Sequence, residues 1–377
     1  MNMARTLITV DDIDDIALGA TVLGTGGGGD PHVGALIASR LIALHGDVTL
    51  MPAEELTADD FVLPVGMIGA PSVSVERIMA ESELVRVIEL AERATGRKPT
   101  AVMPIEVGGG NSMVPIAAAA LSGLPMVDAD AMGRAFPESQ MVSFHLAGYK
   151  PGVTVLVDHH GNEVIMTPVT GPWSERLARA ITTEMGGSAT MIDYMFGGDI
   201  VREAAIPGTL TLAKRIGQLL SGHGAERTGA PLLETLTKEL DAFHLFDGKV
   251  VDLERGFDAG FTRGKAMLEG IGAWKGSQYE LRFQNEMLLA LRDGQLSAVT
   301  PDLICVLDAA TAHPITTETL RYGHRISVVG IPADDRWRTE MGIETAGPRY
   351  FGFDVDWQPV ESLATQREPA TTEWSVS

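Results

Sequence analysis

The chain has little of several residue types that define common protein classes. Its 377 residues include one cysteine, which excludes an intrachain disulfide framework and a thiolate zinc cluster. Lys and Arg number 29 against 50 Asp and Glu, so the formal net charge is −21 and no basic run offers a surface for nucleic acid or an anionic membrane. No apolar run reaches the roughly 18 residues of a membrane span. We therefore expect no nucleic-acid or membrane partner and a cytoplasmic location.

The chain length and the order of predicted helices and strands indicate two domains. A chain of 377 residues is long for one hydrophobic core. Over residues 1–168, stretches typical of strands alternate with helical ones, which predicts an α/β domain with a mainly parallel sheet and helices on both faces. Over residues 169–367, a few helices precede short strands separated by turns, which predicts a β-rich domain. Residues 368–377 are expected to form a flexible tail.

A run of four glycines stands between two predicted helices. It comprises Gly26, Gly27, Gly28 and Gly29. Asp30 and Pro31 fit the N-cap and first residue of the second helix. Backbone N–H groups at a helix N-terminus bind phosphate, carboxylate or a developing oxyanion, so we expect a ligand-facing loop; the alternative is a flexible turn. The run lacks both the lysine of a P-loop and a preceding strand, so no nucleotide cofactor is expected.

A second glycine turn follows a predicted strand in "PIEVGGGNS". Glu106 ends the strand, and Gly109, Gly110 and Asn111 open the next helix. Ligands gather at the carboxyl ends of strands in α/β sheets, so both glycine turns are predicted to face one crevice. Glu106 is a candidate catalytic carboxylate, with a capping or turn-stabilising role as the alternative.

The segment "VDADAMGRAFPE" concentrates polar groups after another predicted strand. Asp128 and Asp130 are two residues apart and so share a face, where one carboxyl with a raised pKa could act as a general base. The same pair could hold a divalent cation, which we leave open as a cofactor. Arg134 and Glu138 are candidate substrate-binding residues. The alternative is a structural loop acid paired with Arg134.

The histidines and the cysteine are expected to be structural. His159 and His160 fall on a predicted hairpin turn, which is typical of solvent exposure, and the chain has no H-E-x-x-H zinc motif. Cys305 is flanked by apolar residues in a predicted strand, which favours a small buried hydrophobe over a nucleophile.

Three stretches together resemble the S-methyl-thiohydantoin desulfurase family, and the likeness extends over residues 10–360. They are "VLGTGGGGDP", "PIEVGGGNSMVPIAAAALSGLPMVDADAMGRAFPE" and "PDLICVLDAATAHPITTETLRYGHRISVVGIPADDRWRT". The resemblance implies a two-domain protein that acts on a five-membered imide-like ring. The implied reaction is a hydrolysis that replaces an S-methyl group by oxygen, releasing methanethiol and leaving a hydantoin.

A mechanistic hypothesis follows from that reaction. Asp128 or Asp130, or a metal that they hold, would activate water, and the N–H groups of the four-glycine run would stabilise negative charge on the ring. Glu106, Asn111 and Arg134 would orient the substrate. Two other functions stay open: a phosphate- or nucleotide-binding enzyme of the kinase or ATPase type, and a non-catalytic partner of a hydantoinase-like protein. We also expect a homo-oligomer.

Overall fold

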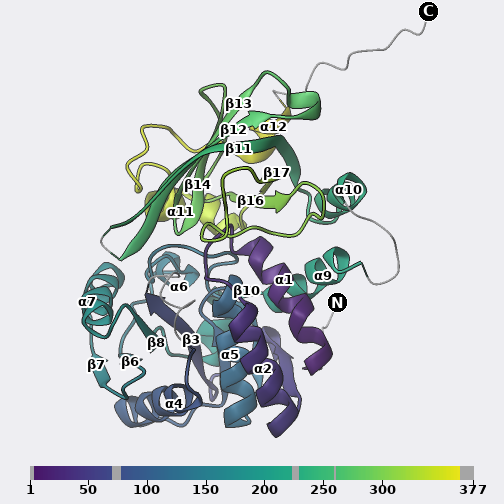
Figure 1. Ribbon diagram of the computed structural model, residues 1–377. Coiled ribbons are helices and arrows are strands. Elements are labelled where there is room, and N and C mark those ends of the chain that lie inside the picture. Colours follow the sequence, from purple (N-terminus) through teal and green to yellow (C-terminus); the bar gives the residue numbers. More distant parts are fainter. Residues whose placement is uncertain (1–3, 70–77, 223–228, 259, 366–377) are drawn as a thin grey trace, which may run out of the picture.

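The computed structural model describes residues 4–69, 78–222, 229–258 and 260–365. Within them, a ten-stranded sheet with its helices is followed by a seven-stranded antiparallel sheet (Figure 1). An α/β part followed by a β-rich part, as predicted, is confirmed. No helix among the described residues is long and apolar enough to cross a membrane.

The first sheet is mixed. Its main path runs β1 (Thr6–Ile8), β2 (Val48–Pro52), β5 (Met126–Asp130), β4 (Ala101–Pro104), β3 (Phe61–Gly69), β8 (Ser188–Ile192), β6 (Thr154–Val157) and β7 (Glu163–Met166). The short strands β9 (Phe196–Gly197) and β10 (Ile206–Pro207) pair with β3 and β5. The central strands β2, β5, β4 and β3 are parallel, and both ends of the sheet are antiparallel. The parallel centre brings the carboxyl ends of these four strands together at one edge.

Helices pack against this sheet and against one another. They are α1 (Ile13–Leu23), α2 (His32–His45), α4 (Glu81–Thr95), α5 (Gly109–Ser122), α6 (Ser143–Leu146), α7 (Gly171–Glu184), α8 (Gly198–Ala204), α9 (Thr209–Leu220) and α10 (Ala230–Glu239). Helices α2 and α4 end at Gly46 and Gly96, and Gly96 adopts the left-handed conformation. Gly19 in α1 and Gly217 in α9 each face the backbone of the other helix, which lets these two helices approach closely.

The second sheet has its own hydrophobic core. Its strands are β11 (Phe243–Asp258), β12 (Phe261–Gly270), β13 (Gln278–Gln284), β14 (Glu286–Arg292), β15 (Gln295–Val299), β16 (Leu303–Asp308) and β17 (Arg325–Ile331), followed by helices α11 (Glu340–Ala346) and α12 (Val360–Thr365). Phe246, Tyr279 and Val328 are among its fully buried side chains. The chain passes from the first sheet to the second between β10 and β11.

Three of the sheet's strands, β8, β9 and β10, come after residue 168 and still pair within the first sheet. The domain boundary after residue 168 stays a prediction. The tail predicted over residues 368–377 lies outside the described residues.

Candidate active site

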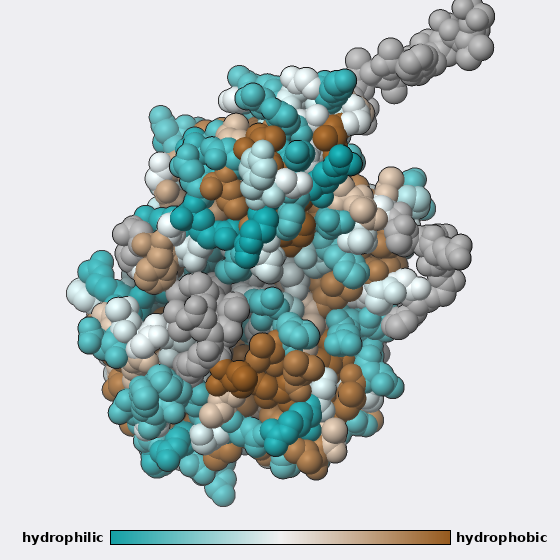
Figure 2. Space-filling view, viewed as in Figure 1, coloured by the Kyte–Doolittle hydropathy of each residue, from teal (hydrophilic) through white to brown (hydrophobic). Residues whose placement is uncertain are grey.

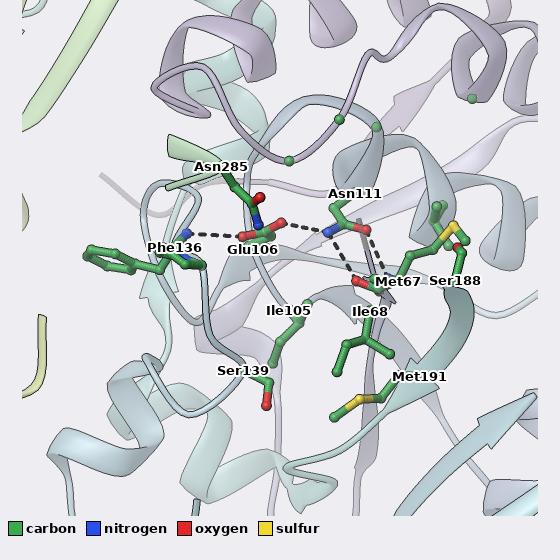
Figure 3. Close-up of a pocket in the computed structure, with 18 of the residues that line it drawn as sticks. Met67, Ile68, Ile105, Glu106, Asn111, Phe136, Ser139, Ser188, Met191 and Asn285 are labelled. Atoms are coloured by element: carbon green, nitrogen blue, oxygen red, sulfur yellow. Dashed lines mark hydrogen bonds between the residues drawn. The ribbon is translucent and has the colours of Figure 1, made fainter. Parts of the chain in front are cut away.

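A cavity of about 140 Å³ lies where the carboxyl ends of β3 and β4 meet the second sheet. Helices α2 and α5 begin at its wall, and the segment after β5, strand β8 and the residue Asp193 that follows it complete the first-sheet side. Asn285 and Glu286 reach it from the second sheet. Figure 3 shows Asn285, Glu106 and Asn111 side by side at this cavity.

The two glycine turns meet backbone to backbone at the cavity. The carbonyl oxygens of Gly29 and Gly28 accept hydrogen bonds from the N–H groups of Gly110 and Asn111, at 3.0 and 3.2 Å. A Cβ atom on Gly28 would lie 2.5 Å from the Gly108 carbonyl oxygen, so only glycine permits this approach. Two N–H groups in the first turn of α5, those of Gly110 and Asn111, are therefore occupied by the loop itself.

Some of the predicted glycine-loop residues line the cavity, and others lie outside its lining. Gly28, Gly29, Asp30, Gly110 and Asn111 line it, whereas Gly26, Gly27 and Gly109 are outside the lining. Asp30 Oδ1 accepts a hydrogen bond from the His32 N–H at 2.8 Å. The helix begins at His32 with Pro31 as its N-cap, one residue later than predicted.

Glu106 is the predicted catalytic carboxyl that lies at the cavity. Its Oε1 accepts a hydrogen bond from Asn111 Nδ2 at 2.6 Å, and its Oε2 accepts one from the Phe136 N–H at 3.3 Å. Asn111 is itself held, because its Oδ1 accepts from the Met67 N–H at 2.9 Å. Burial raises the pKa of Glu106 to about 7, although both hydrogen bonds favour the charged form. This carboxyl exchanges its proton near neutral pH.

Glu286 is a second buried carboxyl at the cavity, and the sequence analysis missed it. Asn285, with φ of 56°, turns the chain between β13 and β14, and its side-chain oxygen accepts from the Thr262 N–H at 2.9 Å. The Met287 N–H donates to the Thr25 carbonyl oxygen at 2.8 Å, which fixes β14 against the glycine loop. Glu286 Oε2 is buried without a hydrogen-bond partner in the described residues.

The pKa of Glu286 lies well above its usual range. Burial is the main cause, the nearby charge of Glu106 adds to it, and the positive charge of Arg134 works against it. The sequence signal that could have revealed this residue is the polar triplet "QNE" inside an apolar strand run. Two carboxyls from different sheets therefore share one cavity, and ionisation of Glu106 favours the protonated form of Glu286.

Arg134 is fully buried beside these carboxyls and does not line the cavity. Its guanidinium donates to the carbonyl oxygens of Pro301 and Asp302 at 2.6 and 3.1 Å, and to Thr25 Oγ1 at 2.9 Å. Glu286 is the largest of the negative charges that act on it. Arg134 ties the two sheets together under the glycine loop.

The structure places Asp128 and Asp130 away from the cavity lining. Asp130 accepts from the N–H groups of Val107, Met132 and Gly133 at 2.8, 3.1 and 2.8 Å, and burial raises its pKa to about 7. Asp128 accepts hydrogen bonds from the N–H groups of Leu210 and Thr211 at the start of α9, at 3.0 and 3.1 Å. Each of the two aspartates therefore holds backbone N–H groups in place. The two-residue spacing of Asp128 and Asp130 in the sequence could not show that the segments after β4 and β5 and the start of α9 supply these hydrogen-bond donors.

The remaining candidates lie outside the cavity lining. Glu138 accepts from Tyr350 Oη at 2.6 Å and from Gln140 Nε2 at 2.5 Å. Cys305 is buried in β16, its thiol donates to the Val22 carbonyl oxygen at 3.1 Å, and burial raises its pKa to about 12. His159 and His160 are exposed on the turn after β6. In the described part of the chain, no three His, Cys, Asp or Glu side chains are grouped as a metal site.

Comparisons with known proteins cover nearly the whole chain. Residues 11–168 match the family model described as S-Me-THD-like, N-terminal domain, and residues 169–360 match S-Me-THD-like, C-terminal domain. A search of curated proteins gives no match. The crystal structure of a protein from Chromobacterium violaceum is similar in fold, with a TM-score of 0.76 at 22% identity, over 94% of this chain and 100% of that one. The chain therefore belongs to the S-Me-THD-like family, the S-methyl-thiohydantoin desulfurase family that its motifs resemble.

Proposed function

We propose that the protein hydrolyses S-methyl-thiohydantoin-type substrates to hydantoins and methanethiol. The observation that carries this proposal is the pair of buried carboxyls, Glu106 and Glu286, at one small cavity in a member of this family. In the reaction, a water oxygen bonds to the ring carbon that bears sulfur, and the carbon–sulfur bond breaks. One water proton is taken up by a base, the second passes to the ring nitrogen, and the leaving sulfur receives a proton from an acid, so that proton transfer from the base to the acid resets the pair. The oxygen stays on the ring as a carbonyl.

Glu106 is the proposed general base. It lies at the cavity, Asn111 and the Phe136 N–H orient it, and its pKa of about 7 suits proton transfer at neutral pH. This proposal moves the base from Asp128 or Asp130 to Glu106, because the oxygens of those aspartates are engaged by backbone N–H groups outside the lining.

Glu286 is the proposed general acid. Burial raises the pKa of Glu286, and ionisation of Glu106 raises it further, so the charge on the proposed base favours the protonated form of the proposed acid. Gly28 and Gly29 also line the cavity, and within the described residues their N–H groups make no hydrogen bond. We assign these two N–H groups to the ring oxygen or to negative charge that develops on the ring.

The phosphate-binding alternative is less well supported. The lining carries the carboxyl groups of Asp30, Glu106, Asp193 and Glu286, which repel a phosphate whenever they are ionised. The N–H groups of Gly110 and Asn111 at the start of α5 are occupied by the glycine loop. A neutral ring fits this lining better than an anion.

The test is incubation of the purified chain with an S-methyl-thiohydantoin, with free thiol and hydantoin measured over time. We expect one methanethiol for each hydantoin formed. If the isolated chain releases no thiol while ATP stabilises it against thermal unfolding, the nucleotide alternative is favoured. Release of thiol only after a co-purified partner is added would favour the non-catalytic subunit.

The pH dependence of kcat/KM should be bell-shaped. Activity rises as Glu106 loses its proton near pH 7, and falls at higher pH as Glu286 loses its own. A rate profile from pH 5 to 10 measures both limbs. A Glu286→Gln variant should be slower and should lose the alkaline limb, whereas a profile without a rise around pH 7 contradicts the assignment of Glu106 as the base.

Replacing Gly27 should affect activity more than folding. A Cβ atom there would lie 1.9 Å from Glu286 Oε1 and 2.6 Å from its Cγ, so Gly27→Ala must displace that carboxyl. We expect kcat to fall about 10²-fold, in the range found when an acid–base group is lost. Gly256→Ala is the control, since neither Gly27 nor Gly256 has positive φ and the Cβ position of Gly256 has no atom within 4 Å. Equal activity of the two variants would show that Glu286 need not sit against the loop.

A further inference from the structure

Glu318 is a further carboxyl beside the proposed acid, and the mechanism above gives it no role. It belongs to the segment between β16 and β17 and lies outside the cavity lining. Its Oε2 is buried without a hydrogen-bond partner in the described residues, and the same holds for Glu286 Oε2. Buried carboxyl oxygens are normally paired, so two unpaired ones on adjoining segments call for an explanation.

Thr317 fixes Glu318 relative to Glu286. Its Oγ1 lies 2.7 Å from the carbonyl oxygen of Asn285, the residue before Glu286, and 3.4 Å from Glu318 Oε1. The Thr317 N–H donates to the Gly26 carbonyl oxygen at 2.9 Å, which joins this segment to the glycine loop. One side chain therefore links the backbone that carries the proposed acid to the carboxyl of Glu318.

Several groups support the charged form of Glu318. Burial raises its pKa, whereas hydrogen bonds from its own N–H, from Thr316 and from Thr317 and the positive charge of Arg255 lower it. Arg255, on β11, and Arg321 both donate to the Glu318 carbonyl oxygen. Since Arg255 is exposed, these contacts bring the Glu318 segment to the protein surface.

The charge of Glu318 acts on Glu286. Burial is the largest cause of the raised pKa of Glu286 and the charge of Glu106 is the next. Glu318 adds to both, whereas the positive charge of Arg134 opposes them. The Glu106 contribution disappears once Glu106 has taken a proton from water. Glu318 takes no part in the proposed reaction, so its charge persists through turnover.

We propose that Glu318 is a positioning residue that acts through Glu286: its carboxylate keeps the proposed acid protonated at the start of each turnover. The inference rests on the proposed ring hydrolysis and adds a residue outside the cavity lining. It follows that the alkaline limit of activity depends on a charge that does not touch the substrate.

The first test is the pH dependence of kcat/KM in Glu318→Gln. Glutamine removes the charge, and its carbonyl oxygen can still accept from Thr317. The alkaline limb should move to lower pH, so that activity above the optimum falls at least about threefold relative to the wild type, whereas the acid limb set by Glu106 stays in place. Glu318→Asp keeps the charge and should regain the alkaline activity. A loss that is equal at every pH would show a structural role and overturn the inference.

Glu254→Gln is the matched control, because it removes one negative charge from an exposed position of β11. The Glu254 side chain is 67% exposed, and its Oε1 lies 3.4 Å from Lys265 Nζ. Figure 2 shows mostly hydrophilic side chains over the second sheet on the face in view. Water and salt screen exposed charges, so the pH profile of this variant should match that of the wild type. An equal shift in both variants would mean that net charge, and not the place of Glu318, moves the limb.

Infrared spectroscopy separates this inference from the proposed function. Glu286→Gln identifies the C=O band of the protonated Glu286 carboxyl, which is then titrated without substrate in the wild type and in folded Glu318→Gln. If the chain releases no thiol but the band disappears at lower pH in Glu318→Gln, the proposed function fails and the control of Glu286 by Glu318 stands. If thiol is released but neither the band nor the alkaline limb moves, the inference is wrong and the proposed function stands.

Discussion

Glu106→Gln should reduce kcat by about 10³-fold, within the 10²–10⁴ range for loss of a general base. The glutamine side chain keeps the size of Glu106, and its carbonyl oxygen can still accept the hydrogen bond from Asn111. What it loses is the ability to take a proton from water. The fold should persist, because the substitution removes a buried carboxyl that is desolvated in the folded state. Thiol release and thermal unfolding together measure the two effects.

Glu138→Gln is the matched control for this variant. Glu138 lies in the segment after β5, is only partly buried and is outside the cavity lining; its carboxylate accepts hydrogen bonds from Tyr350 and Gln140. Its substitution should change kcat less than threefold. If Glu106→Gln retains wild-type turnover with a normal unfolding temperature, another group is the base.

Asp130→Ala should destabilise the protein by about 3–5 kcal/mol. Alanine leaves the buried N–H groups of Val107, Met132 and Gly133 without their acceptor, and each orphaned donor costs about 1–3 kcal/mol, partly offset because the buried carboxyl itself is no longer desolvated. These donors hold the segments after β4 and β5, so the damage reaches the cavity wall. Denaturant unfolding measures the change in free energy.

Asp308→Ala is the control for that prediction. Asp308 also accepts three hydrogen bonds, from the N–H groups of Ala310 and Thr311 and from Thr311 Oγ1, but near the surface where water can replace it. Its loss should cost about 1 kcal/mol. Similar losses for the two variants would mean that burial does not determine the role of Asp130.

The sequence was sufficient for the parts of the site that depend on local signals. The glycine stops after α2 and α4, the β6–β7 hairpin and the meeting of the two glycine turns all follow from backbone requirements that single residues reveal. Glu106 was found because it ends a buried strand before a glycine turn.

Contacts between segments that are distant in the chain could not be predicted from such local sequence signals. Glu286 reaches the cavity only because β14 lies against the glycine loop, some 260 residues away in the chain. The spacing of Asp128 and Asp130 predicts a shared side of the strand, but it does not say that the start of α9 covers that side. Burial of Arg134 likewise depends on the loop at Pro301 and Asp302 from the second sheet region.

The buried carboxyls also affect the net charge of the folded protein and the number of protons released when it unfolds. Glu106, Asp130 and Asp193 have pKa values raised to about 7, 7 and 8, so the folded protein at pH 7 is less negative than the −21 obtained by counting every acid as ionised. In the unfolded chain these groups return to ordinary values near 4. Unfolding at neutral pH therefore releases protons to the buffer. The stability that these groups contribute is fully present below about pH 4, falls as pH rises above that value, and is lost once pH exceeds the folded-state pKa values of about 7 to 8. The measured heat of unfolding consequently includes the ionisation heat of the buffer.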